Sequence, residues 1–394
     1  MALMIPSAAM PANAPENVYD RDYLVVNAAN AFYSLHATMF IFMPAYLYTL
    51  KLSAGVIGLL MATGTLTSVL CKPLNGWLVN RGRHALFLSA GALFSALATL
   101  PWLSPPEPGA ALFFLRAIQG VAYSFFATAA FGYVAAAAPP ARRGEALGVF
   151  GLSFFIPTAF GGQLGELIVG RAGFHGMFAW AILAALPAIA LPALLRRRHT
   201  GATLDRTELR VFFSLHGLVP NTAGFLFGAA YGTIFTFLPV FLMVRHGGTL
   251  GHFVLVYSAA VVATRTLGRR LADRLPRPWV CLAALLLLAA GILGIPWLRG
   301  NLELTLVGVA TGLGHGFLFP ALSAMTVDRA GPGREGMAMA LYTGSFDLGT
   351  VAGSGLLGFV AERLGYAPMF GIAAGLTAAG AAIFLIPGLA RRKG

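Results

Sequence analysis

The sequence predicts an all-α membrane protein whose twelve transmembrane helices form two pseudo-symmetric bundles of six. Three observations lead to this prediction. Of the 394 residues, 58% are hydrophobic and only 10% are charged, and the mean hydropathy is +0.76, which is far less polar than a water-soluble domain. Apolar stretches of about 20 residues or more, long enough to cross a hydrocarbon core about 30 Å thick, recur twelve times. Finally, the second half of the chain repeats the first.

The repeat is visible at several places along the chain. Residues 43–47 (MPAYL) return as 238–242 (LPVFL), and residues 173–178 (GFHGMF) return as 365–370 (GYAPMF). The copies are therefore 195 and 192 positions apart. Two tandem six-helix units related by an axis along the membrane normal are typical of one large class of secondary transporters.

The expected spans divide the chain into five parts. A cytosolic arm (1–22) precedes the first bundle (23–195), a cytoplasmic linker (196–210) precedes the second bundle (211–390), and a basic tail (391–394) follows. No cleavable signal peptide is visible in the arm, because the first apolar run is too long. The twelve spans are expected at 23–48, 54–79, 85–104, 109–138, 145–170, 174–195, 211–244, 250–272, 279–298, 302–327, 336–361 and 367–390.

The basic residues behind the net charge of +13 lie mostly in the loops between the spans and not in a soluble basic domain. With a cytoplasmic N-terminus, 19 of the 27 Lys and Arg residues fall on the cytoplasmic side, 5 on the opposite side and 3 within spans. The positive-inside rule therefore places both termini in the cytoplasm, with the protein in the plasma (inner) membrane. Nucleic-acid binding is not expected, because it would need these charges on one exposed surface.

Two related loops carry a resemblance to a known family. Residues 76–84 (GWLVNRGRH) and 271–277 (LADRLPR) follow the second and eighth spans. They resemble the loop signature Gly-x-Leu-Ala-Asp-Arg-x-Gly-Arg of the major facilitator superfamily, although the first copy is one residue short and has Asn80 in place of Asp. In that family these loops form a cytoplasmic latch. The resemblance therefore implies gating roles for Asn80, Arg81, Arg83, Asp273 and Arg274.

Two further segments resemble signatures of proton-coupled members of that family. Residues 112–120 (LFFLRAIQG) resemble a fourth-span motif in which an intramembrane Arg, here Arg116, is associated with proton coupling. Residues 151–162 (GLSFFIPTAFGG) partly resemble the Gly-Pro-x-x-Gly-Gly motif of exporters. The resemblance implies an antiporter that works by alternating access.

Charged and polar side chains inside the spans are the candidate site, because an ion in hydrocarbon normally faces a polar cavity or a partner. Lys72 and Arg265 are 193 positions apart, which predicts equivalent places on either side of a central cavity. The alternative is that both cations lie near the cytoplasmic ends of their spans and extend to the lipid headgroups or bind the latch loops. The expected substrate-binding residues are Asn30, Ser34, Lys72, Gln119, Tyr123, Tyr231, Arg265 and His315.

Asp347 is the expected proton site, together with Arg116 and His315. It is the acidic residue nearest the middle of a predicted span, and burial disfavours the charged form of a carboxylate. In the repeat, Asp347 aligns with Phe155. The alternative for Asp347 is a structural ion pair with Arg265, Lys72 or Arg116. For His315, an interhelical hydrogen bond is the alternative.

These residues predict a monomeric secondary transporter with a small-molecule substrate, protons and the lipid bilayer as partners. The expected activity is proton-coupled export (efflux) of a small organic solute such as a drug, sugar or metallophore-like metabolite. The alternative is a proton-coupled or exchange carrier of small organic anions held by Lys72, Arg265 and Arg116. An enzyme, a channel, a metal site and a cofactor are not expected, because the eight His residues are scattered and the two Cys residues lie alone in spans.

The charge distribution gives a test of orientation. Reporters fused after Lys393, or inserted in the linker 196–210, should report a cytoplasmic location, because basic loops stay on the cytoplasmic side. Paired alkaline phosphatase and fluorescent-protein fusions measure this. A periplasmic signal at either position would contradict both the orientation and the helix count.

Overall fold

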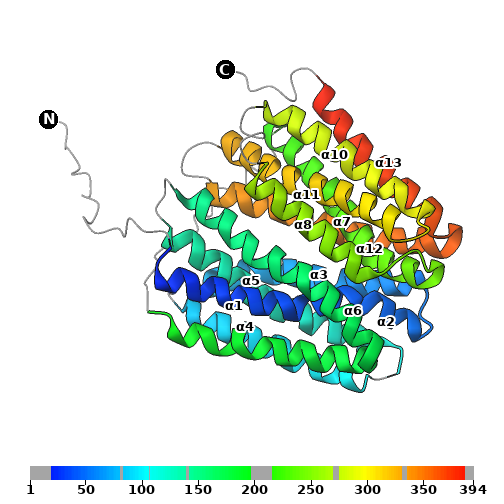
Figure 1. The fold of residues 1–394 in the computed structure, drawn as a ribbon. Helices are drawn as coiled ribbons and strands as arrows, with labels where there is room; N and C mark the ends of the chain where they lie inside the picture. Colours follow the sequence, from blue (N-terminus) through cyan, green and yellow to red (C-terminus); the bar gives the residue numbers. More distant parts are fainter. Residues whose placement is uncertain are drawn as a thin grey trace.

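The computed structural model describes residues 19–79, 83–105, 107–138, 142–196, 215–268, 275–330 and 335–386. Within these ranges all regular secondary structure is helical (Figure 1). The predicted fold class, an all-helical membrane protein with many apolar spans, is confirmed.

The first six spans are formed by six α-helices and short 3-10 segments, with α1 and α2 together making the first span. The span 54–79 was predicted with the bounds that the structure gives to α3. The fifth and sixth spans are both contained in α6, which breaks at Gly173. The helices are α1 (Arg21–Met39), continued by a 3-10 turn (Phe40–Phe42) into α2 (Met43–Thr49), α3 (Ala54–Val79), α4 (His84–Thr99), α5 (Ala110–Ala137) and α6 (Arg143–Ala190).

The remaining six spans are one helix each. Of the described helices, nine are long and apolar enough to cross a membrane, with α6 counted once. The 17-residue α8 and the helix α12 complete the twelve spans. The helices are α7 (Leu215–Arg245), α8 (Leu250–Thr266), α10 (Arg277–Gly294), α11 (Asn301–Ala330), α12 (Glu335–Leu364) and α13 (Tyr366–Ala382).

Two equivalent glycines turn the chain between the last two spans of each half. Gly173 has φ 66° and Gly365 has φ 88°, a region that residues with a Cβ rarely occupy. The two glycines are 192 positions apart, as in the sequence repeat. Each glycine is therefore the single non-helical residue between two helical segments, and the chain turns there.

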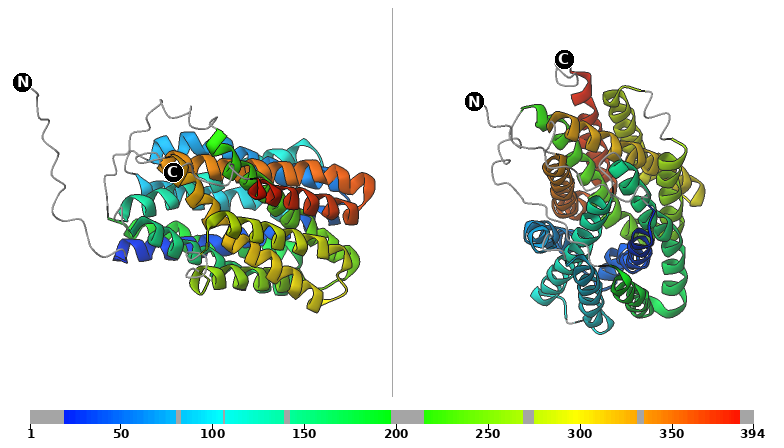
Figure 2. Two further views of the ribbon diagram at one scale, coloured as in Figure 1. Left: turned by 90° about the horizontal axis from the view of Figure 1, so that it is seen from above. Right: turned by 90° about the vertical axis from the view of Figure 1, so that its left-hand side faces the viewer.

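The halves are packed through two helix pairs. Within the first half α1 packs on α6 and α3 on α5, and within the second α7 packs on α12 and α10 on α11. Between the halves, α3 packs against α12 and α6 against α8. The start of α1 and the end of α13 lie toward the same end of the bundle (Figures 1 and 2). We call this the terminal end and the opposite one the distal end.

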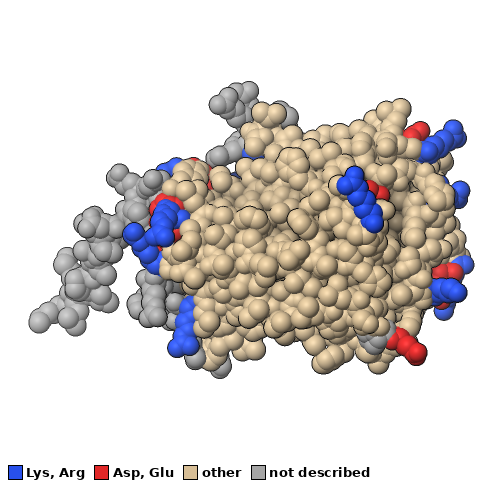
Figure 3. All heavy atoms as spheres, turned by 60° about the horizontal axis from the view of Figure 1, so that its bottom comes forward, with Lys and Arg blue, Asp and Glu red and all other residues tan. Residues whose placement is uncertain are grey.

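The surface fits a lipid environment. On the face shown in Figure 3, charged side chains gather mostly toward the two ends of the molecule, with a broad belt of other residues between them. Large apolar side chains such as Leu70, Phe114 and Leu356 are two-thirds exposed. Such a surface would be unfavourable in water and is favourable against lipid tails. The belt therefore marks the membrane-embedded part of the bundle.

Candidate functional site

The first contact of the candidate site is an ion pair that joins the two halves. The ammonium group of Lys72 on α3 donates a hydrogen bond to the carboxylate of Asp347 on α12. Asp347 lies twelve residues into the 30-residue α12, near its middle. The side chains of Lys72 and Asp347 are 35% and 20% exposed, so solvent reaches the pair. Of the three cations considered as partners of Asp347, Lys72 is the one that it contacts.

The second contact is made by Arg265 at the other interface between the halves. Its guanidinium carbon lies 4.8 Å from the centre of the Phe155 ring on α6, a cation–π contact. A Cβ placed on Gly151, one turn earlier in α6, would lie 1.9 Å from Arg265 Nη1. Arg265 Nε is buried and has no hydrogen-bond partner among the described residues. The described part of the chain offers Arg265 no carboxylate.

The two interfaces are equivalent, and the equivalence corrects the alignment expected from the sequence. Near the distal end, Glu362 accepts a bond from Gly55 N, and Glu166 accepts one from Gly251 N. Glu166 and Glu362 are 196 positions apart in the sequence, and so are Gly55 and Gly251. At this offset, Asp347 corresponds to Gly151 and not to Phe155, and Arg265 lies one helical turn from the equivalent of Lys72. The guanidinium of Arg265 therefore occupies the place where the other interface has its acid.

Aromatic rings surround His315 beside Arg265. His315 Nδ1 shares a hydrogen bond with the Tyr257 hydroxyl. The imidazole is T-shaped to Phe227 at 4.9 Å, to Phe155 at 5.5 Å and to Tyr231 at 5.8 Å between ring centres. The interhelical hydrogen bond considered for His315 is thus present in the structure. The same surroundings give the site apolar walls that suit a planar or aliphatic organic body.

Two tyrosines connect the aromatic cluster to the ion pair. Tyr123 on α5 and Tyr231 on α7 both interact electrostatically with Asp347 and with each other. Tyr123 is 43% exposed although it lies within 6.3 Å of the Tyr33 ring and faces the other half. Tyr123, Tyr231, Lys72 and Asp347 therefore lie near one another in the space between the halves, where Tyr123 is partly exposed.

The other predicted polar residues do not reach this space together. Asn30 Nδ2 donates to Ser153 Oγ at 2.9 Å and so joins α1 to α6, whereas Ser34 Oγ donates to Asn30 O at 2.7 Å within α1. Arg116 donates to Gln119 Oε1 at 2.8 Å and to Leu60 O at 3.3 Å. Leu60 precedes Lys72 by twelve residues, which is about 18 Å along a helix.

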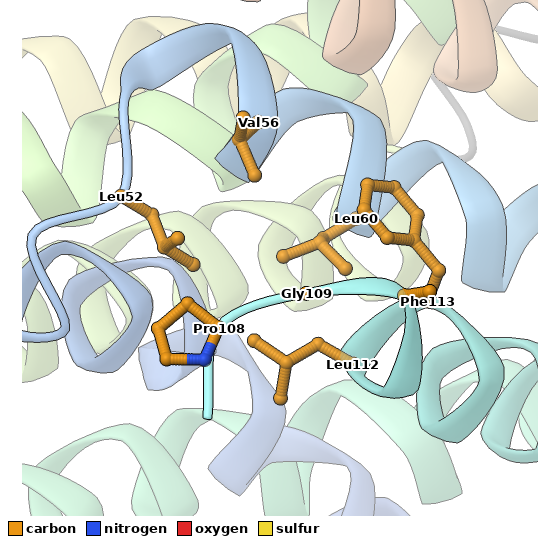
Figure 4. A pocket seen from close by; sticks show the side chains of 8 residues that line it. Leu52, Val56, Leu60, Pro108, Gly109, Leu112 and Phe113 are labelled. Carbon is orange, nitrogen blue, oxygen red and sulfur yellow. The ribbon is translucent and has the colours of Figure 1, made fainter. Parts of the chain in front are cut away.

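Arg116 and Gln119 therefore lie much nearer the distal end than the ion pair. A pocket of about 470 Å³ (Figure 4) is lined in part by Leu60, whose carbonyl oxygen accepts the bond from Arg116. Its lining is apolar, so it offers nothing to an ion. It is formed by Leu52, Val56, Leu60, Pro108, Gly109, Ala110, Leu112 and Phe113.

Most of the predicted gating residues lie outside the described residues. These are Asn80, Arg81, Asp273 and Arg274. Arg83 is described and directly precedes α4 as its cap residue, without a side-chain hydrogen bond to that helix. Both cysteines are described and free, with Cys281 Sγ 3.7 Å from Met325 Sδ.

Three site residues were missed by sequence analysis. Tyr257 precedes Arg265 by eight residues on the same face of α8, a spacing that could have revealed it. Tyr342 is fully buried, its hydroxyl has no partner among the described residues, and it interacts electrostatically with Arg265. Gly151 had no detectable signal, because its role is to leave room for a side chain from the other half.

The comparison with known protein families agrees with this architecture. The sequence model of the Major Facilitator Superfamily matches residues 26–264 and 221–393, which together cover most of the chain. The chain belongs to the major facilitator superfamily. It is therefore a secondary transporter embedded in a membrane by many helices, and not an enzyme.

Sequence relatives in this superfamily span nearly the same length. An uncharacterized MFS-type transporter of Burkholderia pseudomallei (strain 1106a) is 27% identical over 360 residues, covering 86% of this chain and 85% of the relative. One from Salmonella typhimurium (strain LT2) is 24% identical over 357 residues, covering 87% and 90%.

Solved transporters of several specificities share the fold. The nucleoside transporter NupG has a TM-score of 0.77 at 13% identity, covering 94% of this chain and 99% of that one. The peptide transporter POT has a TM-score of 0.76 at 16% identity, covering 92% and 93%. The human organic anion transporter MFSD10 has a TM-score of 0.65 at 19% identity, covering 92% and 99%. At these identities the likeness shows the fold alone.

The bridge between Lys72 and Asp347 gives a stability test. Substitution of either residue leaves the other charge without its partner, whereas the double variant Lys72→Gln, Asp347→Asn removes both. We expect a coupling free energy of about 1 to 2 kcal/mol in a double-mutant cycle, below that of a fully buried pair because both side chains are partly exposed. Thermal unfolding of the purified protein measures it.

The exposed pair Arg277 and Asp328 is the matched control for this cycle, since its side chains are 45% and 47% exposed. Its coupling should be about 0 to 1 kcal/mol. Equal coupling in the two cycles would contradict a special role for the bridge between the halves.

Proposed function

We propose that this transporter carries a small organic anion with an apolar body, together with a proton. The anionic group is held by Arg265 and Lys72, and the body lies among Phe155, Tyr231 and His315. Asp347 carries the proton. This proposal takes up the alternative that the sequence left open, and it removes Arg116 from the anion site because Arg116 lies near the distal end.

The observation that carries the proposal is an imbalance of charge in the middle of the bundle. The described residues there include two cations, Lys72 and Arg265, against one acid, Asp347, which pairs with Lys72. An unpaired ion in a membrane protein interior is costly. Gly151 is the position equivalent to Asp347, and because it is a glycine it gives Arg265 no acidic side chain. A substrate carboxylate, sulfonate or phosphate would supply the missing charge.

Proton coupling follows from the contact between Lys72 and Asp347. While Asp347 is ionised it neutralises Lys72, and the ion pair holds α3 to α12. Protonation of Asp347 releases the ammonium of Lys72 for the anion and weakens the bridge between the halves. Proton and anion thus favour each other's binding, and this linkage is reciprocal. A carrier that binds the proton and the anion together can transport both in the same direction, which supports co-transport.

Export of a neutral or cationic solute, the activity first expected from the sequence, has less support. Such a solute would lie beside the uncompensated guanidinium of Arg265. The resemblance of residues 151–162 to an exporter motif, on which that prediction rested, falls on a segment whose Gly151 accommodates Arg265. The cytoplasmic location of both termini remains part of the proposal, based on the distribution of Lys and Arg.

The substitution Gly151→Asp tests the anion site, with Gly151→Asn as its matched control. Both add a Cβ that the flexible end of Arg265 must accommodate, but only Asp adds a charge. We expect Gly151→Asp to lower uptake of naphthalene-2-sulfonate into proteoliposomes about tenfold or more relative to Gly151→Asn, because an internal counter-ion of Arg265 is worth more than about 1.4 kcal/mol.

A matched cation, 2-naphthylmethylammonium, is the probe for the competing function. Saturable uptake of this cation in the unsubstituted protein, with none of the sulfonate, would contradict the proposal. So would equal sulfonate uptake by the Gly151→Asp and Gly151→Asn variants, if both melt at similar temperatures.

A further inference from the structure

Two carboxylates at the distal end join the halves in an equivalent way. Glu362, near the end of α12, accepts hydrogen bonds from Gly55 N at 3.0 Å and from Ser53 Oγ at 2.9 Å, at the start of α3. Glu166 on α6 accepts a hydrogen bond from Gly251 N at 2.9 Å, at the start of α8. Each acid therefore binds the N-terminus of a helix in the other half.

The electrostatics of these contacts are favourable. The first backbone N–H groups of a helix have no partner within the helix, and the helix dipole places partial positive charge there. A carboxylate that accepts such an N–H makes a charge-assisted hydrogen bond. Because the acid and the helix belong to different halves, this bond exists only while the halves touch at the distal end.

The close approach depends on glycines that flank each acid. A Cβ on Gly55 would lie 2.4 Å from Glu362 Oε2, and a Cβ on Gly251 would lie 2.7 Å from Gly162 O. Gly358 is also tightly packed, since a Cβ placed on it would lie 2.8 Å from Ala54 O and 3.3 Å from Gly55 Cα. Gly162 and Gly358, like Glu166 and Glu362, are 196 positions apart. The two acids and these glycines are therefore repeated in both halves, whereas the second donor, Ser53, is given for Glu362 alone among the described residues.

We infer that Glu166 and Glu362 are a pair of gating residues that hold the distal end closed by capping α8 and α3, and that both bonds must break when the transporter opens there. A two-state equilibrium shifts by the free energy of contacts made in only one state. These two bonds are such contacts. The inference concerns the conformational cycle and holds for any substrate, so it does not rest on the proposed anion.

Access to a thiol behind this closure tests the inference. The side chain of Ala62 is 6% exposed and faces α12, since a Cβ on Gly355 would lie 3.5 Å from Ala62 Cβ. Ala62→Cys, in a background with Cys71→Ala and Cys281→Ala, puts the thiol about two turns inside Gly55. Its rate of reaction with a membrane-impermeant maleimide is measured in intact cells and in inside-out vesicles.

Neutral substitutions of the acids should open the distal end. We expect Glu362→Gln to raise the labelling rate about three-fold to ten-fold, and Glu166→Gln somewhat less because the described residues give it one donor and Glu362 two. The double variant should exceed about ten-fold, since separated sites act almost additively. Ser53→Ala, which removes one donor and leaves both acids in place, should give a smaller rise than Glu362→Gln.

Glu303→Gln is the matched control. Glu303 lies in the first turn of α11, also at the distal end, and bridges no described residue of the first half. Its labelling rate should stay within about two-fold of the parent, because no bond between the halves is lost. The inference is overturned if the double variant melts like the parent and is labelled at the parent's rate in both preparations. It is also overturned if Glu303→Gln has the same effect as Glu362→Gln.

Discussion

The charged side chains in the middle of this bundle depend for their stability on the partners that the opposite half provides at two helix contacts. At the contact of α3 with α12, Lys72 meets Asp347. At the equivalent contact of α8 with α6, Arg265 meets Gly151 and the ring of Phe155. An ion that leaves water for a membrane protein needs compensation. The first contact supplies it from the chain itself, and at the second we propose that the solute supplies it.

The same two contacts also connect the site to the conformational cycle. Both begin at the distal end with a carboxylate bound to a helix N-terminus, and both continue inward to the central cations. In the proposed mechanism, substrate and proton therefore act on the surfaces that separate when the distal end opens. In alternating access, one half moves against the other around a site near the middle of the membrane. We infer that the bonds of Glu166 and Glu362 form and break in this movement.

The sequence predicted the fold well because the apolar stretches and the repeat can be recognised along the chain without knowing which helices pack together. The span 54–79 has the predicted bounds, and the acid expected near the middle of a span, Asp347, lies near the middle of α12. The partner of Asp347 could not be chosen from three cations, because periodicity gives the face of a helix but not the helix that packs against it. The repeat offset was ambiguous for the same reason, since it changes from 192 to 196 between helices.

The remaining features depend on packing between distant parts of the chain. Gly151 and Tyr342 act through a side chain of α8 that only the folded structure brings near. Glu166 and Glu362 were recognisable as acids near span ends, but their role appears only when α3 and α8 from the opposite halves are placed beside them. The gating loop residues of the superfamily signature, other than Arg83, lie outside the described residues.

The central claim is that protonation of Asp347 makes the middle of the bundle more attractive to an anion. The most direct test is the affinity of the purified protein for naphthalene-2-sulfonate as a function of pH, compared between the parent and Asp347→Asn. The parent should bind more tightly as pH falls, because protonation frees Lys72. The Asn variant should bind tightly at every pH, since its residue 347 cannot ionise. A pH dependence that survives in Asp347→Asn would contradict the account.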